Sequence, residues 1–220
     1  MELKLKLTND GSHTLYRTDL DETYHSTHGA IQESKHVFIK KGLDYSCSDL
    51  GKKKISILEV GFGTGLNCFL SFLYAKKNNI FIEYTALEIN PLCNQIVKEL
   101  NYCTNQDEQC IFNKMHSVNW NELNGISSDF KLNKIHNSLQ EYTFKNTFDL
   151  VYFDAFGPRV EPNLWKKEWY EKIKTSLNNN AIIVTYCAKG AVRRDLISAG
   201  YIIERLEGPP GKREMLRGSI

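Results

Sequence analysis

The residues best suited to chemistry follow three apolar runs of the chain. Gly61, Gly63 and Gly65 alternate directly behind the first run, and two later runs end in Glu88 and Asp154. Glycine permits positive φ angles and lets a ligand approach the backbone where a Cβ would collide. Because ligands of parallel α/β sheets bind outside the carboxyl ends of the strands, these residues predict one site of bare backbone and two carboxylates.

The spacing of the glycines excludes two common nucleotide-binding loops. A dinucleotide fingerprint requires G-x-G-x-x-G, but Leu66 stands where the third glycine would be. A Walker A loop also requires Gly-Lys-Ser/Thr, which this stretch lacks. The loop therefore matches neither kind of site.

The form E-x-G-x-G-x-G, from Glu59 to Gly65, resembles the first motif of class I S-adenosylmethionine-dependent methyltransferases. The resemblance implies that the loop bends around the methionine and ribose of that cofactor, and that Glu88 accepts hydrogen bonds from the ribose hydroxyls. The cofactor-binding residues it implies are Glu59, Gly61, Gly63, Thr64, Gly65, Asn67, Glu88 and Asp154. The structural alternatives are an ordinary α/β turn, a solvated strand-end charge at Glu88 and a structural partner at Glu59.

Three further motifs narrow the family: 21–38 (DETYHSTHGAIQESKHVF), 154–165 (DAFGPRVEPNLW) and 208–218 (GPPGKREMLRG). Together they resemble the methyltransferase domains of the bifunctional tRNA 5-methylaminomethyl-2-thiouridine biosynthesis family, over nearly the whole chain. The resemblance implies a Rossmann-like fold, S-adenosylmethionine as cofactor, and N-methylation of 5-aminomethyl-2-thiouridine at the tRNA wobble position (U34). Bifunctional members also carry a flavin-dependent oxidase domain. Because the chain ends at Ile220, we expect a stand-alone methyltransferase supplied by a separate enzyme.

Class I methyltransferases often have an acidic residue after the third strand of their fold, and it holds the adenine amino group. The chain departs from this pattern. The stretch KIHNSLQEY offers Asn137, Ser138 and Gln140 instead. An amide oxygen accepts the same hydrogen bond, so Asn137 is the expected adenine contact.

Asp154 is the candidate catalytic residue. Methyl transfer from a sulfonium to an amine needs an aligned, unprotonated nitrogen and support for the positive charge that moves onto it. In water an alkylamine has a pKa of about 10 and Asp a pKa of about 4, but the sulfonium and desolvation bring the two together. Asp154 is therefore interpreted as a general base or as an anchor for the amine, with a helix N-cap as the structural alternative.

Aromatic and apolar residues of the same motifs are candidates for the acceptor side. Phe156, Pro158 and Trp165 could exclude water, and Tyr24 or Phe156 could stack on the wobble base. Glu33 is a further candidate for contact with the acceptor. The aromatic residues fit an ordinary core equally well, and Glu33 fits a solvated turn. The histidines show no metal-ligand spacing with cysteines, so we expect no metal.

The carboxy-terminal segment 189–220 carries seven basic residues against four acidic ones. Arg193, Lys212 and Arg213 are the residues expected to contact tRNA, because its phosphates attract Lys and Arg. An ordinary solvated basic face explains the same composition.

An alternation of strands and helices from Ile55 onward must position these residues. The predicted strands are 55–60, 81–89, 148–154 and 181–187, with a final pair at 201–208 and 213–218. Helices are predicted at 66–74, 92–100 (capped by Asn90-Pro91), 118–123, 164–177 and 190–200. Small strands, including one at 36–39, are expected before residue 50. We therefore expect a mainly parallel sheet with helices on both faces, divided into a β-rich extension (1–50) that contributes to the active site and a Rossmann-like methyltransferase domain (51–220).

Composition adds few limits. The 220 residues, 41% of them hydrophobic, are enough for one core-bearing domain, and a net charge of +2 neither demands nor excludes a nucleic acid. The amino terminus has no signal-like apolar region, and no stretch approaches the roughly 18 apolar residues of a membrane span. Six cysteines without a CxxC pair suggest reduced thiols. We expect a cytoplasmic protein with no membrane partner.

Two other functions fit part of the pattern. An aminopropyltransferase of the spermidine synthase type shares the fold and presents an amine to an acidic site, but it does not require the basic carboxy-terminal motif. A non-catalytic RNA-binding module of methyltransferase fold would not require the glycine loop, Glu88 and Asp154 together.

Overall fold

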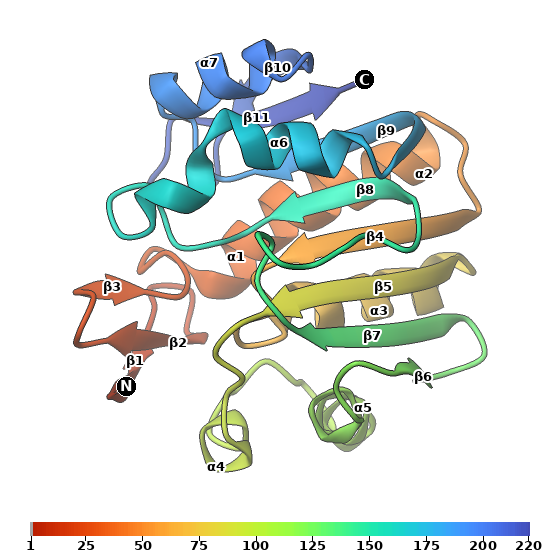
Figure 1. Cartoon of the computed structure of the whole chain (residues 1–220). Helices are drawn as coiled ribbons and strands as arrows, with labels where there is room; N and C mark the ends of the chain where they lie inside the picture. The colour runs from red at the N-terminus through yellow and green to blue at the C-terminus, as the bar shows by residue number, and fades with distance from the viewer. Residues whose placement is uncertain (1) are drawn as a thin grey trace.

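One large sheet organises the computed structural model, which describes residues 2–220 (Figure 1). Its strands are β4 (Lys54–Val60), β5 (Phe81–Glu88), β6 (Leu123–Gly125), β7 (Phe130–His136), β8 (Phe148–Phe153), β9 (Leu177–Thr185), β10 (Ile202–Glu207) and β11 (Glu214–Ser219). They lie in the order β10-β11-β9-β8-β4-β5-β7-β6. The pairs among β7, β5, β4, β8 and β9 are parallel, and β6, β11 and β10 join antiparallel at the edges.

Helices cover both faces of this sheet, which confirms the predicted fold class (Figure 1). Behind it in Figure 1 lie α1 (Ala30–Ser34), η1 (Lys35–Asp44), α2 (Tyr45–Ser48) and α3 (Leu66–Asn78). In front lie α6 (Lys167–Lys174), preceded by the short η2 (Pro162–Trp165), and α7 (Gly190–Ser198). Two further helices, α4 (Asn94–Val97) and α5 (Gln106–Ser117), follow β5.

Side chains along the central strands point into two hydrophobic cores, one on each face of the sheet. On β4, Ile55 and Ile57 belong to the core under α1, η1 and α3. Leu58 and Val60 belong to the core under α6 and α7. Both sets are buried, as expected for a parallel sheet covered on two sides, so β4 reads as a continuous apolar run.

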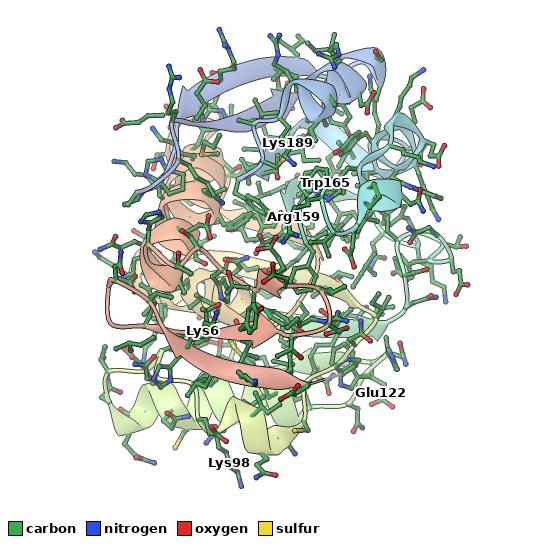
Figure 2. All side chains as sticks on the ribbon, turned by 90° about the vertical axis from the view of Figure 1, so that its left-hand side faces the viewer. Lys6, Lys98, Glu122, Arg159, Trp165 and Lys189 are labelled. Atoms are coloured by element: carbon green, nitrogen blue, oxygen red, sulfur yellow. The ribbon has the colours of Figure 1, made fainter. Side chains whose placement is uncertain are left out.

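A small antiparallel sheet stands at the carboxyl ends of the central strands. It consists of β1 (Leu3–Leu7), β2 (His13–Arg17) and β3 (Glu22–Thr23), in that order. Figure 2 views this side of the molecule, with Lys6 of β1 in the foreground. The structure thus confirms a small amino-terminal sheet, within residues 3–23, and places it where ligands of such folds bind, while residues 30–48 of the expected β-rich extension are helical.

Three sequence-based predictions about elements are wrong. Residues 36–39 are helical, within η1, because Val37 and Phe38 pack on the central sheet; a short apolar run does not distinguish a strand from a buried helix. Residues 118–123 are not helical, because α5 ends at Ser117 and Val118 is extended. Asn90-Pro91 does not begin a helix: the Asn90 N–H donates to Glu88, and α4 starts only at Asn94.

No helix among residues 2–220 combines the length and apolar character needed to cross a membrane. All six cysteines are free thiols, and Cys47, Cys68 and Cys187 are buried.

Candidate active site

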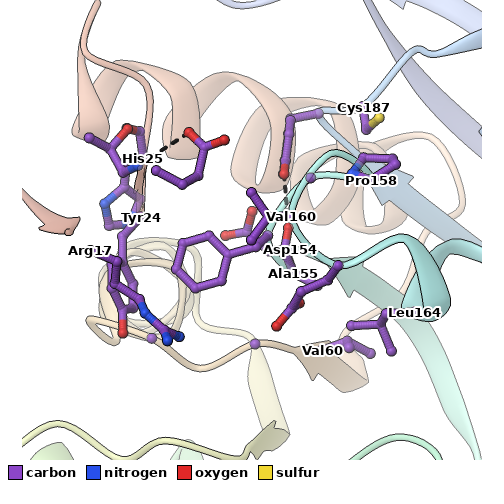
Figure 3. A pocket seen from close by; sticks show the side chains of 18 of the residues that line it. Arg17, Tyr24, His25, Val60, Asp154, Ala155, Pro158, Val160, Leu164 and Cys187 are labelled. Atoms are coloured by element: carbon purple, nitrogen blue, oxygen red, sulfur yellow. Dashed lines mark hydrogen bonds between the residues drawn. The ribbon is translucent and has the colours of Figure 1, made fainter. Parts of the chain in front are cut away.

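The order of the strands opens a crevice between β4 and β8. The chain proceeds from β4 to β5 and β7 on one side, and from β8 to β9 on the other. A reversal of this kind separates the loops at the carboxyl ends of the two central strands. A cavity of about 820 Å³ lies there, lined by residues that follow β4, β5, β8 and β9 and by the amino-terminal sheet. Figure 3 shows Arg17 and Tyr24 on one side of it, Pro158 and Cys187 on the other, and Asp154 between them.

The glycine loop adopts a backbone that other residues rarely adopt. Gly61, Gly63 and Gly65 have φ angles of 95°, 50° and 75°. A Cβ on Gly61 would lie 2.8 Å from the Asp154 carbonyl oxygen, so this glycine allows the loop to touch the end of β8. A Cβ on Gly63 would lie 3.1 Å from the Tyr24 ring. Gly61, Gly63 and the neighbouring Thr64 line the cavity, whereas Gly65 lies behind it at the start of α3.

Two backbone N–H groups hold Glu88, one from the loop after β4 and one from the residues after β5. Its Oε2 accepts the N–H of Gly63 at 2.8 Å, and its Oε1 accepts the N–H of Asn90 at 2.7 Å. Each carboxylate oxygen retains a lone pair for a ligand. Glu88 also lines the cavity, and so does Asn137, whose side-chain oxygen accepts the Ser138 N–H at 2.8 Å.

One amide connects the side chains of Glu59 and Asp154. The Nδ2 of Asn67 donates to Glu59 Oε1 at 3.0 Å and to Asp154 Oδ2 at 2.7 Å. Asn67 and Asp154 line the cavity, whereas Glu59 lies beneath it, 1% exposed. Glu59 thus orients Asn67, and Asn67 holds one oxygen of Asp154 while the other remains available.

Burial raises the pKa of both carboxyl groups. For Asp154 the charge of Glu33 adds to the rise, while the Asn67 hydrogen bond and the positive charge of Lys212 oppose it. For Glu59, burial and the charge of Asp154 raise the pKa, and the Asn67 hydrogen bond opposes the rise. The site therefore favours proton exchange at Asp154 at a higher pH than a solvated aspartate would.

Tyr24, from the amino-terminal segment, lies beside Phe156 and Pro158, from the loop after β8, while Trp165 takes a different position. Tyr24 and Phe156 pack edge to face, their ring centroids 5.0 Å apart, and both line the cavity with Pro158. Trp165 is buried outside the lining, and its Nε1 donates to the Phe156 carbonyl at 2.7 Å. Trp165 therefore supports the loop from behind.

The predicted acidic and basic residues take different places. Glu33 and Lys212 both line the cavity and form an ion pair of 2.5 Å. Arg213 lines a shallow neighbouring groove with Arg205, and Lys189 and Lys212 line both the groove and the cavity. Figure 2 labels Lys189 on the same side of the molecule as Arg159, which also lines the cavity. Arg193 lies on α7 and lines neither hollow.

The sequence reasoning missed several residues of the site. Two histidines lie on either side of Thr64: buried His25, whose Nε2 lies 3.3 Å from the hydroxyl, and half-buried His116, whose Nε2 lies 3.1 Å from the carbonyl oxygen. No local sequence pattern predicts contacts between residues so far apart in the chain. Tyr186 also lines the cavity, and its hydroxyl donates to the Ala155 carbonyl at 2.8 Å. Because Tyr186 follows β9, the rule that pointed to Glu88 and Asp154 could have found it.

The fold and the site define a class: an α/β enzyme of the class I methyltransferase type, with a glycine loop, an acidic residue at the end of β5 and a carboxylate after β8. The profile of the S-adenosyl-L-methionine-dependent methyltransferases matches residues 98–220. The chain belongs to this family, which confirms the predicted cofactor, S-adenosylmethionine.

Curated relatives share one name. The tRNA 5-methylaminomethyl-2-thiouridine biosynthesis bifunctional protein MnmC of Pseudoalteromonas atlantica is 29% identical, over 92% of this chain and 32% of its own length. The protein of the same name from Campylobacter fetus is 26% identical, over 94% of this chain and 34% of its own. The chain thus spans about a third of these relatives.

Solved structures confirm the fold. MNMC2 from Aquifex aeolicus has a TM-score of 0.81 at 24% identity, over 99% of this chain and 70% of that chain. Spermidine synthase from Thermotoga maritima has a TM-score of 0.56 at 12% identity, over 100% of this chain and 71% of that one. The fold is therefore shared with proteins of different names, so the fold alone does not assign the reaction.

Proposed function

We propose that this chain methylates the aminomethyl nitrogen of 5-aminomethyl-2-thiouridine at the wobble position of tRNA, giving 5-methylaminomethyl-2-thiouridine. The observation that carries the proposal is the position of Asp154: at the end of β8, beside the glycine loop, with one oxygen held by Asn67 and the other free in the cavity. The shared name of the curated relatives supports the choice of substrate.

The cofactor fits the polar groups on one side of the cavity. Gly61 and Gly63 leave the backbone open, and Glu88 has lone pairs left for ribose hydroxyls. Asn137, on the neighbouring strand end, has an amide oxygen for the adenine amino group. When bound, S-adenosylmethionine supplies an electrophilic methyl group on a sulfonium. Thr64 and Asn67 complete this side, and Glu59 and Gly65 support it from below.

Asp154 then acts on the acceptor amine. Its free oxygen accepts a hydrogen bond from the nitrogen, which orients the lone pair and stabilises the positive charge that develops there. Because burial raises its pKa, Asp154 is also a better proton acceptor than a solvated aspartate. Anchor and base are thus two uses of the same contact.

The acceptor base occupies the aromatic side of the cavity. Tyr24 and Phe156 offer ring faces and edges on which a base displaced from the anticodon can stack. Pro158 extends this apolar wall and excludes water, while Trp165 holds the backbone of Phe156. The amino-terminal segment 1–50 contributes Tyr24 to this side, in keeping with its expected role beside the domain 51–220.

The tRNA backbone would follow the basic groove next to the cavity. Lys189 and Arg213 line it, both exposed, and Arg193 on α7 would extend the footprint. Such contacts neutralise phosphates without reading sequence. A separate enzyme that supplies the aminomethyl intermediate and a cytoplasmic location complete the proposal.

The test is an assay on tRNA from cells that lack this protein. We expect the purified chain, with labelled S-adenosylmethionine, to convert 5-aminomethyl-2-thiouridine into its N-methyl form, detected by mass spectrometry of the nucleosides. Putrescine with the decarboxylated cofactor serves as the control for aminopropyl transfer. Methylation of another nucleoside, or aminopropyl transfer alone, would refute the proposal.

A further inference from the structure

Three motifs that lie far apart in the sequence meet on one wall of the cavity. Glu33, on α1, accepts the Ser26 N–H at 2.8 Å with one oxygen and Lys212 Nζ at 2.5 Å with the other. The Lys212 ammonium also lies 3.9 Å from the centre of the Tyr186 ring. Since the Tyr186 hydroxyl donates to the carbonyl of Ala155, the wall ends at the residue that follows Asp154.

The ion pair on this wall is shielded from water. The side chain of Glu33 is 8% exposed and that of Lys212 31%. A pair in such a position is screened less by solvent than a surface pair, and loss of one partner leaves an uncompensated charge. Lys212 also lines the groove, but its ammonium is paired within the protein, whereas Arg213 beside it is exposed.

Glu33 and Lys212 line the same cavity as Asp154, so their charges influence its carboxyl group. The titratable groups that face this carboxyl are Glu33 and Lys212 on the wall, Glu59 through Asn67, and the Tyr186 hydroxyl. Glu33 raises the pKa of Asp154 and Lys212 lowers it, so the balance between them depends on the ion pair.

We propose that the Glu33–Lys212 ion pair is the positioning device that keeps Asp154 available as a carboxylate: Lys212 cancels the charge of Glu33 instead of binding RNA. This inference rests on the proposed function of Asp154. It makes Glu33 and Lys212 positioning residues that act through Asp154, in place of the acceptor and tRNA contacts that the sequence suggested.

Replacing the two partners one at a time should shift the pKa of Asp154 in opposite directions. Lys212→Met leaves a bare anion near Asp154, so the pKa of Asp154 rises. Glu33→Gln leaves a bare cation there, so the pKa of Asp154 falls. The pKa of the acceptor amine shifts in the same directions, because a nearby anion stabilises its ammonium form and a nearby cation destabilises it. A wall that served packing alone would give no such reversal of sign.

The first test needs no substrate. The side-chain carboxyl carbons of the full chain are labelled with ¹³C and titrated by NMR, and Asp154→Asn identifies the Asp154 signal. We expect the midpoint to rise by about one pH unit or more in Lys212→Met and to fall by a similar amount in Glu33→Gln. The double variant should return towards wild type, and Lys212→Arg and the control Arg213→Met should leave the midpoint in place. Shifts of the same sign in both single variants, or none, would overturn the inference.

The second test separates this role from RNA binding. The acid limb of the pH profile of kcat, with saturating tRNA and cofactor, should move up in Lys212→Met and down in Glu33→Gln. The KM for tRNA and its salt dependence should change in Arg213→Met but not in Lys212→Met. If Lys212→Met weakens tRNA binding as Arg213→Met does and leaves the pH profile alone, Lys212 is an RNA contact. A wild-type chain that methylates no tRNA would refute the proposed function, while the NMR titration would still decide the charge balance.

Discussion

At the scale of single residues, hydrogen bonds within the protein already orient the carboxylates of the site. Both amide hydrogens of Asn67 are used, one on Glu59 and one on Asp154. Both oxygens of Glu88 already accept backbone N–H groups. Each acid is thus oriented before a ligand arrives, which reduces the entropy lost on binding and reaction.

Asp154→Asn should lower turnover by about a hundredfold or more, the lower range for loss of a general base. The asparagine oxygen can still accept from Asn67, but its amide then presents donors to the amine where a carboxylate accepted. Because the carboxylate matters most in the transition state, cofactor affinity should change far less. Single-turnover rates with saturating cofactor and tRNA measure the chemical step, and calorimetry of the cofactor is the control. A near-normal rate would make Asp154 a scaffold residue.

Glu88→Ala should weaken cofactor binding by roughly tenfold to a hundredfold, the cost of losing one charged hydrogen-bond acceptor. It also removes the partner of the Gly63 N–H, so the glycine loop loses an attachment. Calorimetric titration with S-adenosylhomocysteine measures the effect, and tRNA affinity of the same variant is the comparison. A larger loss of tRNA affinity than of cofactor affinity would assign Glu88 to the RNA surface.

At the scale of elements, the turn from β4 into α3 carries the cofactor side of the site. Gly63→Val should abolish cofactor binding without unfolding the chain. The new side chain would project towards the Tyr24 ring, and φ of 50° strains a β-branched residue. Thermal unfolding and calorimetry test both halves of this expectation. Gly125→Val is the matched control, since Gly125 has open space around its Cβ position and no positive φ. Undiminished affinity in Gly63→Val would remove the loop from the cofactor site.

The groove beside β9 and β11 should account for much of the salt dependence of tRNA binding. Replacing Lys189 and Arg213 with Met should reduce the slope of log affinity against log salt by about one for each phosphate that the protein no longer neutralises. Cofactor affinity should stay constant. Neutralising Arg193 and Arg194 on α7 should reduce the slope less, because neither residue lines the groove. Equal slopes in all variants would make this face an ordinary solvated surface.

At the scale of the whole molecule, both ends of the chain close the same cavity. The β1–β3 sheet and α1 contribute one side, and the loop between β10 and β11 reaches them through Lys212 and Glu33. His36 Nε2 also lies 2.8 Å from the Glu207 carbonyl oxygen. Folding of the site therefore requires contacts between the first and last parts of the sequence.

Stability should fall between pH 6.5 and 4 because the folded chain keeps two histidines neutral, His25, which is buried, and His116, which is half-buried. Burial lowers the pKa of His25 and of His116 to about 4; Glu33 and Asp10 oppose the shift at His25, and Lys134 adds to it at His116. The unfolded chain then binds more protons than the folded one in this window, so acidification favours unfolding. At pH 5 the effect is on the order of 2 kcal/mol for each histidine.

Urea unfolding at pH 7 and pH 5 measures this loss. His116→Gln, which keeps a donor for Thr64, should reduce the difference between the two pH values by that amount. His136→Gln, at an exposed position, should leave the difference unchanged. An equal pH dependence in His116→Gln would mean that other groups cause the acid instability.

Local pattern was sufficient for strands β4, β5, β8 and β9 and for the residues at their carboxyl ends, but it did not predict β6, β7 or α5 in the polar stretch 101–146. An apolar run followed by glycines predicts a strand and a tight turn wherever it occurs, because burial and positive φ are properties of a few neighbouring residues. Parallel strands then bring their carboxyl ends to one edge. This reasoning identified Gly61, Glu88 and Asp154. The basic character of the last segment followed from its composition alone.

Tertiary packing decided the rest. Residues 36–39 are helical because they belong to η1, which packs on one face of the sheet. A four-residue apolar run does not specify which element it packs against. Glu59 lies below the site, not in it, and Lys212 pairs with Glu33 across 179 positions of the chain. Such contacts depend on burial and charge between distant segments. Their partners leave no periodic or spaced signal in the sequence, and only the folded chain brings them within hydrogen-bonding distance.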